Sequence, residues 1–275
     1  MTTSVRSPQS LDTWVTRGYA VLQTDYQGLG TPGGHPYVDG TSEANTVIDI
    51  VRAARTLDPA IGTDWVAMGH SQGGQAALFT AQDAHKRAPE LNLKAAVAIA
   101  PGGVGLSEAV DLAKSGRPEA EAAQAFLPVI VLGAQVVDPS IDPESIFTPQ
   151  AMPLIAAARA GCLVQIREVP PVPAAQVFKA DADVSALTEY LRRQDPTNVT
   201  PQVPTMIVQG TSDTLVTTPG TDALVKAMCG RDVAVDYRVY PGQDHRGTVP
   251  ASLQDAQDFV GRAMSGESTT DTCQR

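Results

Sequence analysis

The sequence has few cysteines, a net negative charge and no long apolar run. Only 3 of its 275 residues are cysteine and none forms a Cys-x-x-Cys pair, so neither a zinc site nor a disulfide-rich scaffold is indicated. No stretch approaches the roughly 18 uninterrupted apolar residues of a membrane-spanning helix, so we expect no stable membrane insertion. The formal net charge is −10 and the 20 Lys and Arg residues are scattered, which argues against nucleic acid as a partner.

The three cysteines differ in their surroundings. Cys229 ends a predicted helix and Cys273 lies in the C-terminal tail, so a bridge between them would tie down the C-terminus. Cys162 has apolar neighbours, a context typical of a buried free thiol. The opening MTTSVRSPQSLDTW lacks the basic-then-apolar pattern of a signal peptide. The location is therefore left unknown, and a homodimer is compatible with the sequence.

Strands and helices alternate at short spacing in two parts of the chain. Apolar runs of strand length are followed by helical patterns, with strands predicted at 19–25, 64–69, 93–103, 204–210 and 233–242. Such alternation predicts an α/β protein with a mostly parallel sheet and helices on both faces. We therefore assign residues 1–103 and 204–275 to one core domain.

Residues 104–203 interrupt this alternation with helical stretches separated by proline-rich joints such as DPSIDPESIFTP. One interpretation is a helical subdomain packed on the sheet. The other is a helical cap, or lid, over an active site, because long insertions at the loop end of a sheet are usually functional. Its apolar stretches, FLPVIVLG among them, favour a substrate with a hydrophobic acyl or alcohol part.

One short motif carries the chemistry. Gly69-His70-Ser71-Gln72-Gly73 matches G-x-S-x-G, with a predicted strand before it and a predicted helix after it. In that context the tight turn would hold the Ser71 hydroxyl at the tip of the sheet as a nucleophile. The N–H of Gln72 would then point into the same space as an oxyanion-hole donor. The alternative is a serine in a structural turn.

A serine nucleophile needs a base and an orienting acid, and both occur at later strand ends. Asp213 lies three residues beyond the predicted strand 204–210, and His245 follows the last predicted strand. The order Ser, Asp, His is that of the α/β-hydrolases. Among the four histidines His245 is therefore the predicted base. His70 lies inside the turn motif and His85 on the polar side of a helix.

Taken together, the runs GYAVLQTDYQGLG, HPYVDGTSEANTVIDIVRAAR, GHSQGGQAALF, VQGTSDTLV and YPGQDHRG resemble the secretory lipase family of the α/β-hydrolase superfamily, which contains the fungal lipase A type and actinobacterial relatives. The resemblance implies a carboxylic-ester hydrolase with a helical cap and an extracellular location. It also implies that the backbone N–H of Asp25 is the second oxyanion donor. Tyr26, His35 and His70 are expected to contribute to substrate binding.

The same resemblance exposes a difference in the sheet. The family has several strands before the segment that matches GYAVLQTDY, whereas 18 residues precede that segment here. The strand that normally lies between it and the strand leading to Ser71 is expected to be absent. Three explanations stay open: a truncated member of the family, re-pairing of the sheet, or a strand supplied by a partner.

These observations predict a serine esterase or lipase of the carboxylesterase and triacylglycerol lipase type, without a metal or organic cofactor. Its partner would be a small-molecule or lipid ester. An acyltransferase and a peptidase or amidase would use the same three residues, because the reactions differ only in the leaving group and the acceptor. A catalytically weak, truncated hydrolase fold acting as a binding module is the alternative from another class.

Overall fold

The computed structural model describes residues 8–117 and 124–273, which form two compact units. The sheet unit contains residues 8–26, 40–104 and 196–273, and the helical unit contains 27–39 together with 105–195 outside the undescribed gap. The predicted insertion, 104–203, stays a prediction, and the helical unit differs from it at both ends. The loop 27–39 belongs to the helical unit because Val38 is buried in that unit's hydrophobic core, and residues 196–203 belong to the sheet unit.

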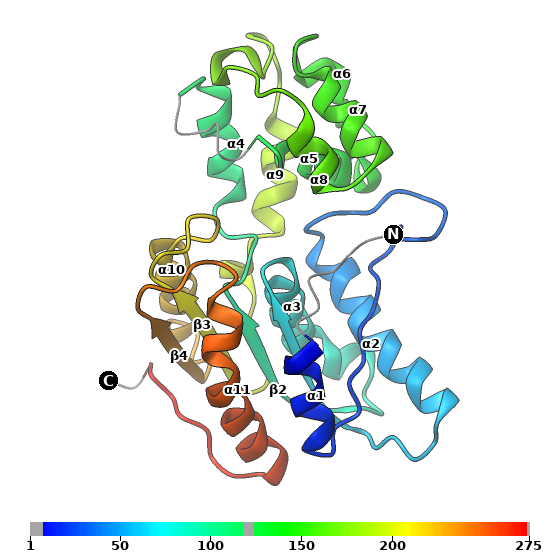
Figure 1. The fold of residues 1–275 in the computed structure, drawn as a ribbon, viewed down its shortest axis with the longest axis vertical. Helices are drawn as coiled ribbons and strands as arrows, with labels where there is room; N and C mark the ends of the chain where they lie inside the picture. The colour runs from blue at the N-terminus through cyan, green and yellow to red at the C-terminus, as the bar shows by residue number, and fades with distance from the viewer. Residues whose placement is uncertain (1–7, 118–123, 274–275) are drawn as a thin grey trace. The chain divides into compact units, whose positions relative to one another are not determined.

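The sheet unit is built on four parallel strands in the order β1-β2-β3-β4 (Figure 1). The strands are β1 (Asp64–His70), β2 (Asn92–Ile99), β3 (Thr205–Gly210) and β4 (Val235–Tyr240). Every residue of β3 and the last five residues of β2 are buried. Nearly continuous apolar sequence is what a parallel strand covered on both faces requires. The α/β prediction is confirmed.

Helices cover both faces of this sheet (Figure 1). They are α1 (Pro8–Thr16), α2 (Gly40–Leu57), α3 (Gln72–Arg87), α10 (Thr218–Cys229) and α11 (Thr248–Ser265). Val97 packs with α1 and α11 on one face, whereas its neighbour Ala98 packs with α2, α3 and α10 on the other. This division follows from the alternation of side chains along a strand. A short 3-10 helix, η3 (Pro196–Asn198), precedes β3.

The helical unit has a hydrophobic core of its own, in which Phe147, Ile155, Ile166 and Tyr190 are among the fully buried side chains. Its elements are α4 (Leu106–Lys114), α5 (Leu127–Val137), α6 (Pro143–Ile146), α7 (Met152–Ala160), α8 (Leu163–Glu168), η2 (Ala174–Gln176) and α9 (Ser185–Arg193). Proline occupies the first or second position of α5, α6 and α7, where its missing N–H costs no helical hydrogen bond. The proline-rich joints of the sequence thus begin helices.

The predicted strand 19–25 is wrong. The segment is extended but belongs to no strand, and residues 20–25 make no backbone–backbone hydrogen bond within the described chain. Its apolar composition suits a buried strand, yet a strand forms only beside a hydrogen-bonding neighbour. In the described residues β1 pairs with β2 alone, so this neighbour is missing.

The sequence left open whether Cys229 and Cys273 are bridged, and it indicated a buried thiol at Cys162. Cys229 and Cys273 form a disulfide bond, and the N–H of Thr272 donates to the Val235 carbonyl, so the tail lies along the start of β4. Cys162 is a free thiol, as predicted, but it is exposed. It occupies the N-cap of α8, and of its apolar neighbours Ile166 is buried whereas Val164 is 60% exposed.

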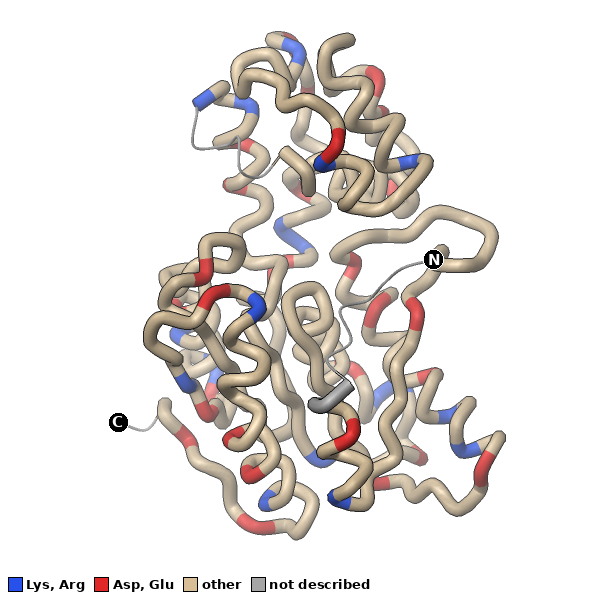
Figure 2. Tube along the Cα trace, viewed as in Figure 1, with Lys and Arg blue, Asp and Glu red and all other residues tan. Residues whose placement is uncertain are grey.

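Charged residues are spread along the chain in each unit (Figure 2). Several pair locally, as Arg52 does with Asp49 and Glu90. Within the described residues, no helix is both long enough and apolar enough to cross a lipid bilayer.

Candidate active site

Ser71 lies in a strained turn between β1 and α3. β1 ends at His70 and α3 begins at Gln72, and Ser71 between them has φ 59° and ψ −120°. A non-glycine residue at positive φ is uncommon and costs free energy. A Cβ atom added at Gly69 would lie 2.0 Å from the carbonyl oxygen of Gly73, so the turn closes only with glycine at that position.

The turn is fixed by its backbone hydrogen bonds. The Ser71 N–H donates to the Ile99 carbonyl on β2 at 2.9 Å. Its own carbonyl accepts from Gly74 and from Gly102, each at 2.9 Å. Ser71 is therefore held beyond the carboxyl end of β1, next to the first N–H groups of α3, where the helix dipole favours negative charge.

Asp213 occupies the turn after β3, three residues beyond Gly210. Its side chain is fully buried. One carboxylate oxygen, Oδ1, accepts hydrogen bonds from the N–H groups of Leu215 and Val216, both at 2.9 Å. The other, Oδ2, lies 2.7 Å from Nδ1 of His245. The carboxylate is thus locked toward the imidazole ring.

His245 lies in the loop between β4 and α11 and meets two predicted residues. Besides its contact with Asp213, its carbonyl oxygen lies 2.7 Å from Nε2 of His70, and the two rings are 4.4 Å apart between centroids. Burial, and then the proximity of His245, lowers the pKa of His70 below 6.5. The adjacent Asp244 accepts from the N–H groups of Arg246 and Gly247 and so shapes the loop.

The three predicted catalytic residues all follow carboxyl ends of parallel strands in the sheet unit, which is where such sheets bind ligands. The described structure contains no hydrogen bond between Ser71 Oγ and His245. Catalytic hydrogen bonds are often long without substrate. His70 connects the turn at Ser71 with the loop of His245, because it precedes Ser71 in sequence and its Nε2 contacts the His245 carbonyl oxygen.

A buried carboxylate that the sequence did not reveal contacts the turn. Glu43 on α2 is 1% exposed, and its Oε1 accepts a hydrogen bond from Nε2 of Gln72 at 2.7 Å. An acidic residue near the start of a helix is common for dipole reasons alone. Because Glu43 and Gln72 are 29 residues apart in the sequence, no local sequence pattern indicates this contact.

Tyr26 lies close to the same turn. A Cβ atom added at Gly73 would be 3.8 Å from its hydroxyl oxygen. Burial, and then the charge of Glu43, raises the pKa of Tyr26 above its usual value. Its predicted role in substrate binding stays a prediction, but the structure places it beside the residue after Gln72.

The remaining predicted residues are less constrained by the structure. Asp25 is exposed, and its carbonyl accepts from the Thr24 hydroxyl at 3.0 Å. His35 belongs to the helical unit, where its Nδ1 lies 2.9 Å from the Gln27 carbonyl. Their roles as oxyanion donor and pocket residue stay predictions. In residues 8–117 and 124–273 no cluster of three or more His, Cys, Asp or Glu side chains is arranged to hold a metal ion.

The family model described as serine aminopeptidase, S33, matches residues 2–248. No curated protein matches the chain.

Similarity to solved structures identifies the fold of the chain. Candida antarctica lipase A has a TM-score of 0.80 at 18% identity, over 98% of this chain and 64% of that one. A putative hydrolase from Legionella pneumophila has a TM-score of 0.76 at 21% identity, over 92% and 72%. The rice cell wall degrading esterase LipA from Xanthomonas oryzae has a TM-score of 0.63 at 19% identity, over 83% and 66%. The chain thus has the α/β-hydrolase fold and spans 64% of the length of lipase A.

Proposed function

The chain belongs to the serine aminopeptidase S33 family of α/β-hydrolases, and on that basis we propose that it is a serine hydrolase that cleaves carboxylic esters. The observation that carries the proposal is the 2.7 Å contact between Asp213 and His245, in the same unit as the strained turn at Ser71. The names of the similar solved structures, a lipase and an esterase among them, support an ester as the substrate.

In the proposed reaction Ser71 attacks the ester carbonyl. His245 accepts the hydroxyl proton as general base and later donates it to the departing alcohol. Asp213 fixes the proton on Nδ1, so that Nε2 is the basic nitrogen, and stabilises the imidazolium that forms. Water then attacks the acyl-enzyme while His245 accepts its proton; the bond to Ser71 Oγ breaks, His245 returns the proton to that oxygen, and the carboxylic acid leaves.

The oxyanion of the tetrahedral intermediate needs N–H donors. The first is the backbone N–H of Gln72, which opens α3 and gains from the positive end of the helix dipole. Asp25 is retained as the second donor. Loss of one such donor costs about 10²–10³-fold in kcat in other serine hydrolases.

The substrate is proposed to have a hydrophobic part, with the helical unit acting as a cap. Apolar side chains of that unit which remain only partly buried, Phe126, Leu132 and Met152 among them, support this choice. No metal or organic cofactor takes part in the proposed steps.

The direct test is hydrolysis of p-nitrophenyl esters from acetyl to palmitoyl by the purified chain. Ser71→Ala should abolish turnover, and Ser265→Ala, at the exposed end of α11, should leave it unchanged. Equal hydrolysis by wild type and Ser71→Ala would refute the role of Ser71. A folded wild type, checked by circular dichroism, that hydrolyses none of the esters would favour the binding-module alternative. The optimum acyl length separates an esterase from a lipase.

A peptidase is the second candidate, because the family description names an aminopeptidase. The same three residues would cleave an amide if His245 protonates the leaving amine. Aminoacyl p-nitroanilides assayed beside the esters decide between the two. A higher kcat/KM on the anilides, lost in Ser71→Ala, would replace the esterase assignment.

A further inference from the structure

A buried glutamine near the end of β3 carries polar groups that the proposed reaction does not use. Gln209 is 0% exposed, in a strand whose residues are all buried. Strands buried on both faces are normally apolar, and a fully buried glutamine is uncommon. The groups around Gln209 therefore have to supply hydrogen bonds for its whole amide.

Both polar atoms of the Gln209 side chain have partners. Nε2 donates to the carbonyls of Val216 at 2.8 Å and Gly210 at 3.0 Å, and Oε1 accepts from the Thr221 hydroxyl at 2.7 Å. Because carbonyls only accept, the NH₂ group must face them, and the orientation of the amide is fixed. Gln209 thus joins β3 to the turn that follows it and to α10.

The contact with Val216 fixes the turn that carries Asp213. The N–H groups of Leu215 and Val216 donate to Oδ1 of Asp213, so the orientation of this carboxylate depends on these two residues. Among the described residues, the bond from Gln209 is the one hydrogen bond that joins residues 214–216 to β3. A displacement of Val216 would therefore displace the carboxylate as well.

Asp213 in turn contacts the predicted base. Its Oδ2 lies 2.7 Å from Nδ1 of His245, and its side chain is fully buried. Hydrogen bonds thus run without interruption from α10 through Gln209 to the carboxylate of Asp213 and the imidazole of His245. Buried polar networks are rigid when every member has its partners.

We propose that Gln209 is a positioning residue that anchors the turn after β3 and so holds the carboxylate of Asp213 toward His245, a role that rests on the proposed function. Gln209 does not touch the reacting atoms. Its effect is geometric, and a displacement of about 1 Å at a catalytic group can reduce the rate about 100-fold.

The alternative is that Gln209 only stabilises the core, and Thr205 provides the matched reference. Thr205 is also 0% exposed on β3, but it begins the strand, and its hydroxyl donates to the Val203 carbonyl at 3.0 Å. Loss of that buried hydrogen bond should lower stability without moving Asp213. Variants at the two ends of β3 therefore separate a structural role from a positioning role.

The kinetic test uses the p-nitrophenyl ester that the wild type hydrolyses fastest. Gln209→Met keeps a similar side-chain length but removes the hydrogen bonds of the amide, and we expect kcat to fall about 10- to 100-fold while KM changes less than about twofold. Thr221→Val removes only the bond to Oε1 and should cause a smaller fall. Thr221→Ser keeps the hydroxyl and should recover the wild-type kcat, and Thr205→Val should also keep it.

Proton NMR tests the contact without any substrate. The proton between Nδ1 of His245 and the carboxylate of Asp213 gives a low-field signal, which is assigned by its absence from His245→Gln. We expect this signal in the wild type and in Thr205→Val. In Gln209→Met it should be lost, because a loosened contact exchanges its proton with water faster. A chain that hydrolyses no ester would contradict the proposed function, whereas this measurement would still decide the role of Gln209.

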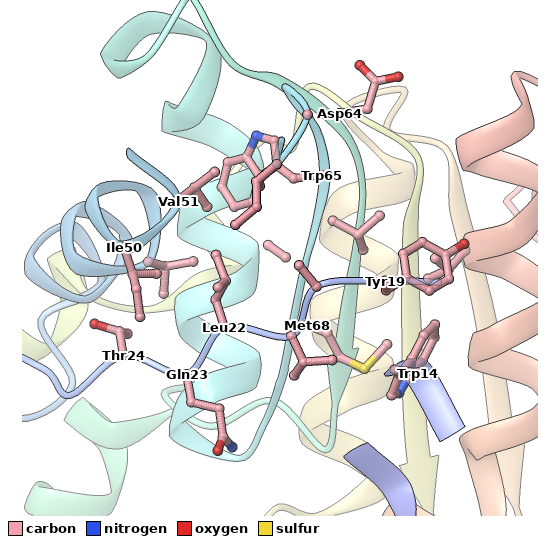
Figure 3. Close-up of a pocket in the computed structure, with 18 of the residues that line it drawn as sticks. Trp14, Tyr19, Leu22, Gln23, Thr24, Ile50, Val51, Asp64, Trp65 and Met68 are labelled. Atoms are coloured by element: carbon pink, nitrogen blue, oxygen red, sulfur yellow. The ribbon is translucent and has the colours of Figure 1, made fainter. Parts of the chain in front are cut away.

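Tryptophan fluorescence checks that the variants keep the rest of the sheet unit. The sequence has two tryptophans, Trp14 on α1 and Trp65 on β1, and both line a cavity of about 730 Å³ beside β1 (Figure 3). Neither belongs to β3, to α10 or to the turn between them. The emission spectrum should therefore be the same in the wild type, Gln209→Met and Thr205→Val. If Gln209→Met does not fold by this measure, Thr221→Val replaces it in both tests.

Three results would overturn the proposal. One is a Gln209→Met protein that keeps both the wild-type kcat and the low-field signal. Another is an equal fall in kcat for Gln209→Met and Thr205→Val, which would show a general effect of a lost buried hydrogen bond. The third is a wild type without the low-field signal, because the contact that Gln209 is proposed to hold would then be absent. Loss of the signal in Gln209→Met, with the signal retained in Thr205→Val, would support the proposal.

Discussion

His70 lies against His245, with Nε2 of His70 2.7 Å from the His245 carbonyl and 4.4 Å between the ring centroids. The predicted base is therefore supported by the residue that precedes the predicted nucleophile. Because burial and the neighbouring ring lower the pKa of His70, the folded state favours its neutral form.

This contact predicts how stability depends on pH. A group with a lowered pKa in the folded state contributes stability above its unfolded pKa, about 6.5, and loses it as the pH falls through the folded value. The free energy of unfolding should therefore decrease below about pH 6.5. Urea denaturation at several pH values between 5 and 8 measures this free energy.

His70→Gln should flatten that decrease. It should not abolish it, because the pKa of His35 is also lowered by burial. His85→Gln, on the exposed side of α3, is the control and should keep the wild-type slope. If His70→Gln has the same slope as His85→Gln, then His70 does not contribute.

The strained backbone at Ser71 predicts a conflict between stability and activity. Positive φ costs a non-glycine residue about 1–3 kcal/mol, and a glycine at this position would relieve that strain. Part of the stabilisation is offset because glycine loses more conformational entropy on folding. Ser71→Gly should be more stable than Ser71→Ala by about 1 kcal/mol, with both inactive. Urea unfolding of the two variants provides the comparison. A less stable glycine variant would mean that the turn is not strained in solution.

Much of the sheet unit could be predicted from sequence because its signals are local. The glycines at 69 and 73 fit a tight strand-to-helix turn, and Asp213 follows β3 at the predicted distance. In a parallel sheet, residues after different strands meet at one edge. This rule predicts that Asp213 and His245 lie close together although they are 32 residues apart in the sequence.

The errors arose where the outcome depended on distant parts of the chain. Residues 19–25 have strand composition, but no local feature shows that a pairing partner is missing. The contact between Glu43 and Gln72 and the exposure of Cys162 likewise depend on which elements pack together. The loop 27–39 was assigned by its position in sequence, whereas Val38 packs in the helical unit.

Glu43 is expected to act as a positioning residue, through Gln72. Glu43→Ala removes the buried acceptor of the Gln72 side chain, and a hydrogen bond to a charged group contributes about 1.5–3 kcal/mol. The α3 start would loosen where the proposed oxyanion donor lies. We expect kcat for ester hydrolysis to fall about tenfold or more with little change in KM.

Glu43→Gln keeps an acceptor oxygen and should recover most of the lost kcat. Glu90→Ala, at an exposed surface ion pair with Arg52, is the matched control and should behave as wild type. A Glu43→Ala enzyme with lowered stability but normal kcat would show that Glu43 has only a structural role.

The disulfide between Cys229 and Cys273 should stabilise the sheet unit substantially. It closes a loop with a sequence separation of 44, for which the chain-entropy relation gives about 4 kcal/mol. It also holds the tail along β4, where the Thr272 hydroxyl accepts from the Tyr237 N–H and covers part of that sheet edge. In the double variant Cys229→Ser with Cys273→Ser, the free energy of unfolding should therefore fall by about 2–4 kcal/mol. Both this variant and the reduced wild type should unfold at a lower urea concentration. Cys162→Ser, at an exposed free thiol, should match oxidised wild type. If reduction leaves the unfolding midpoint unchanged, the bridge does not constrain the unfolded chain, and the tail contacts alone hold the β4 edge.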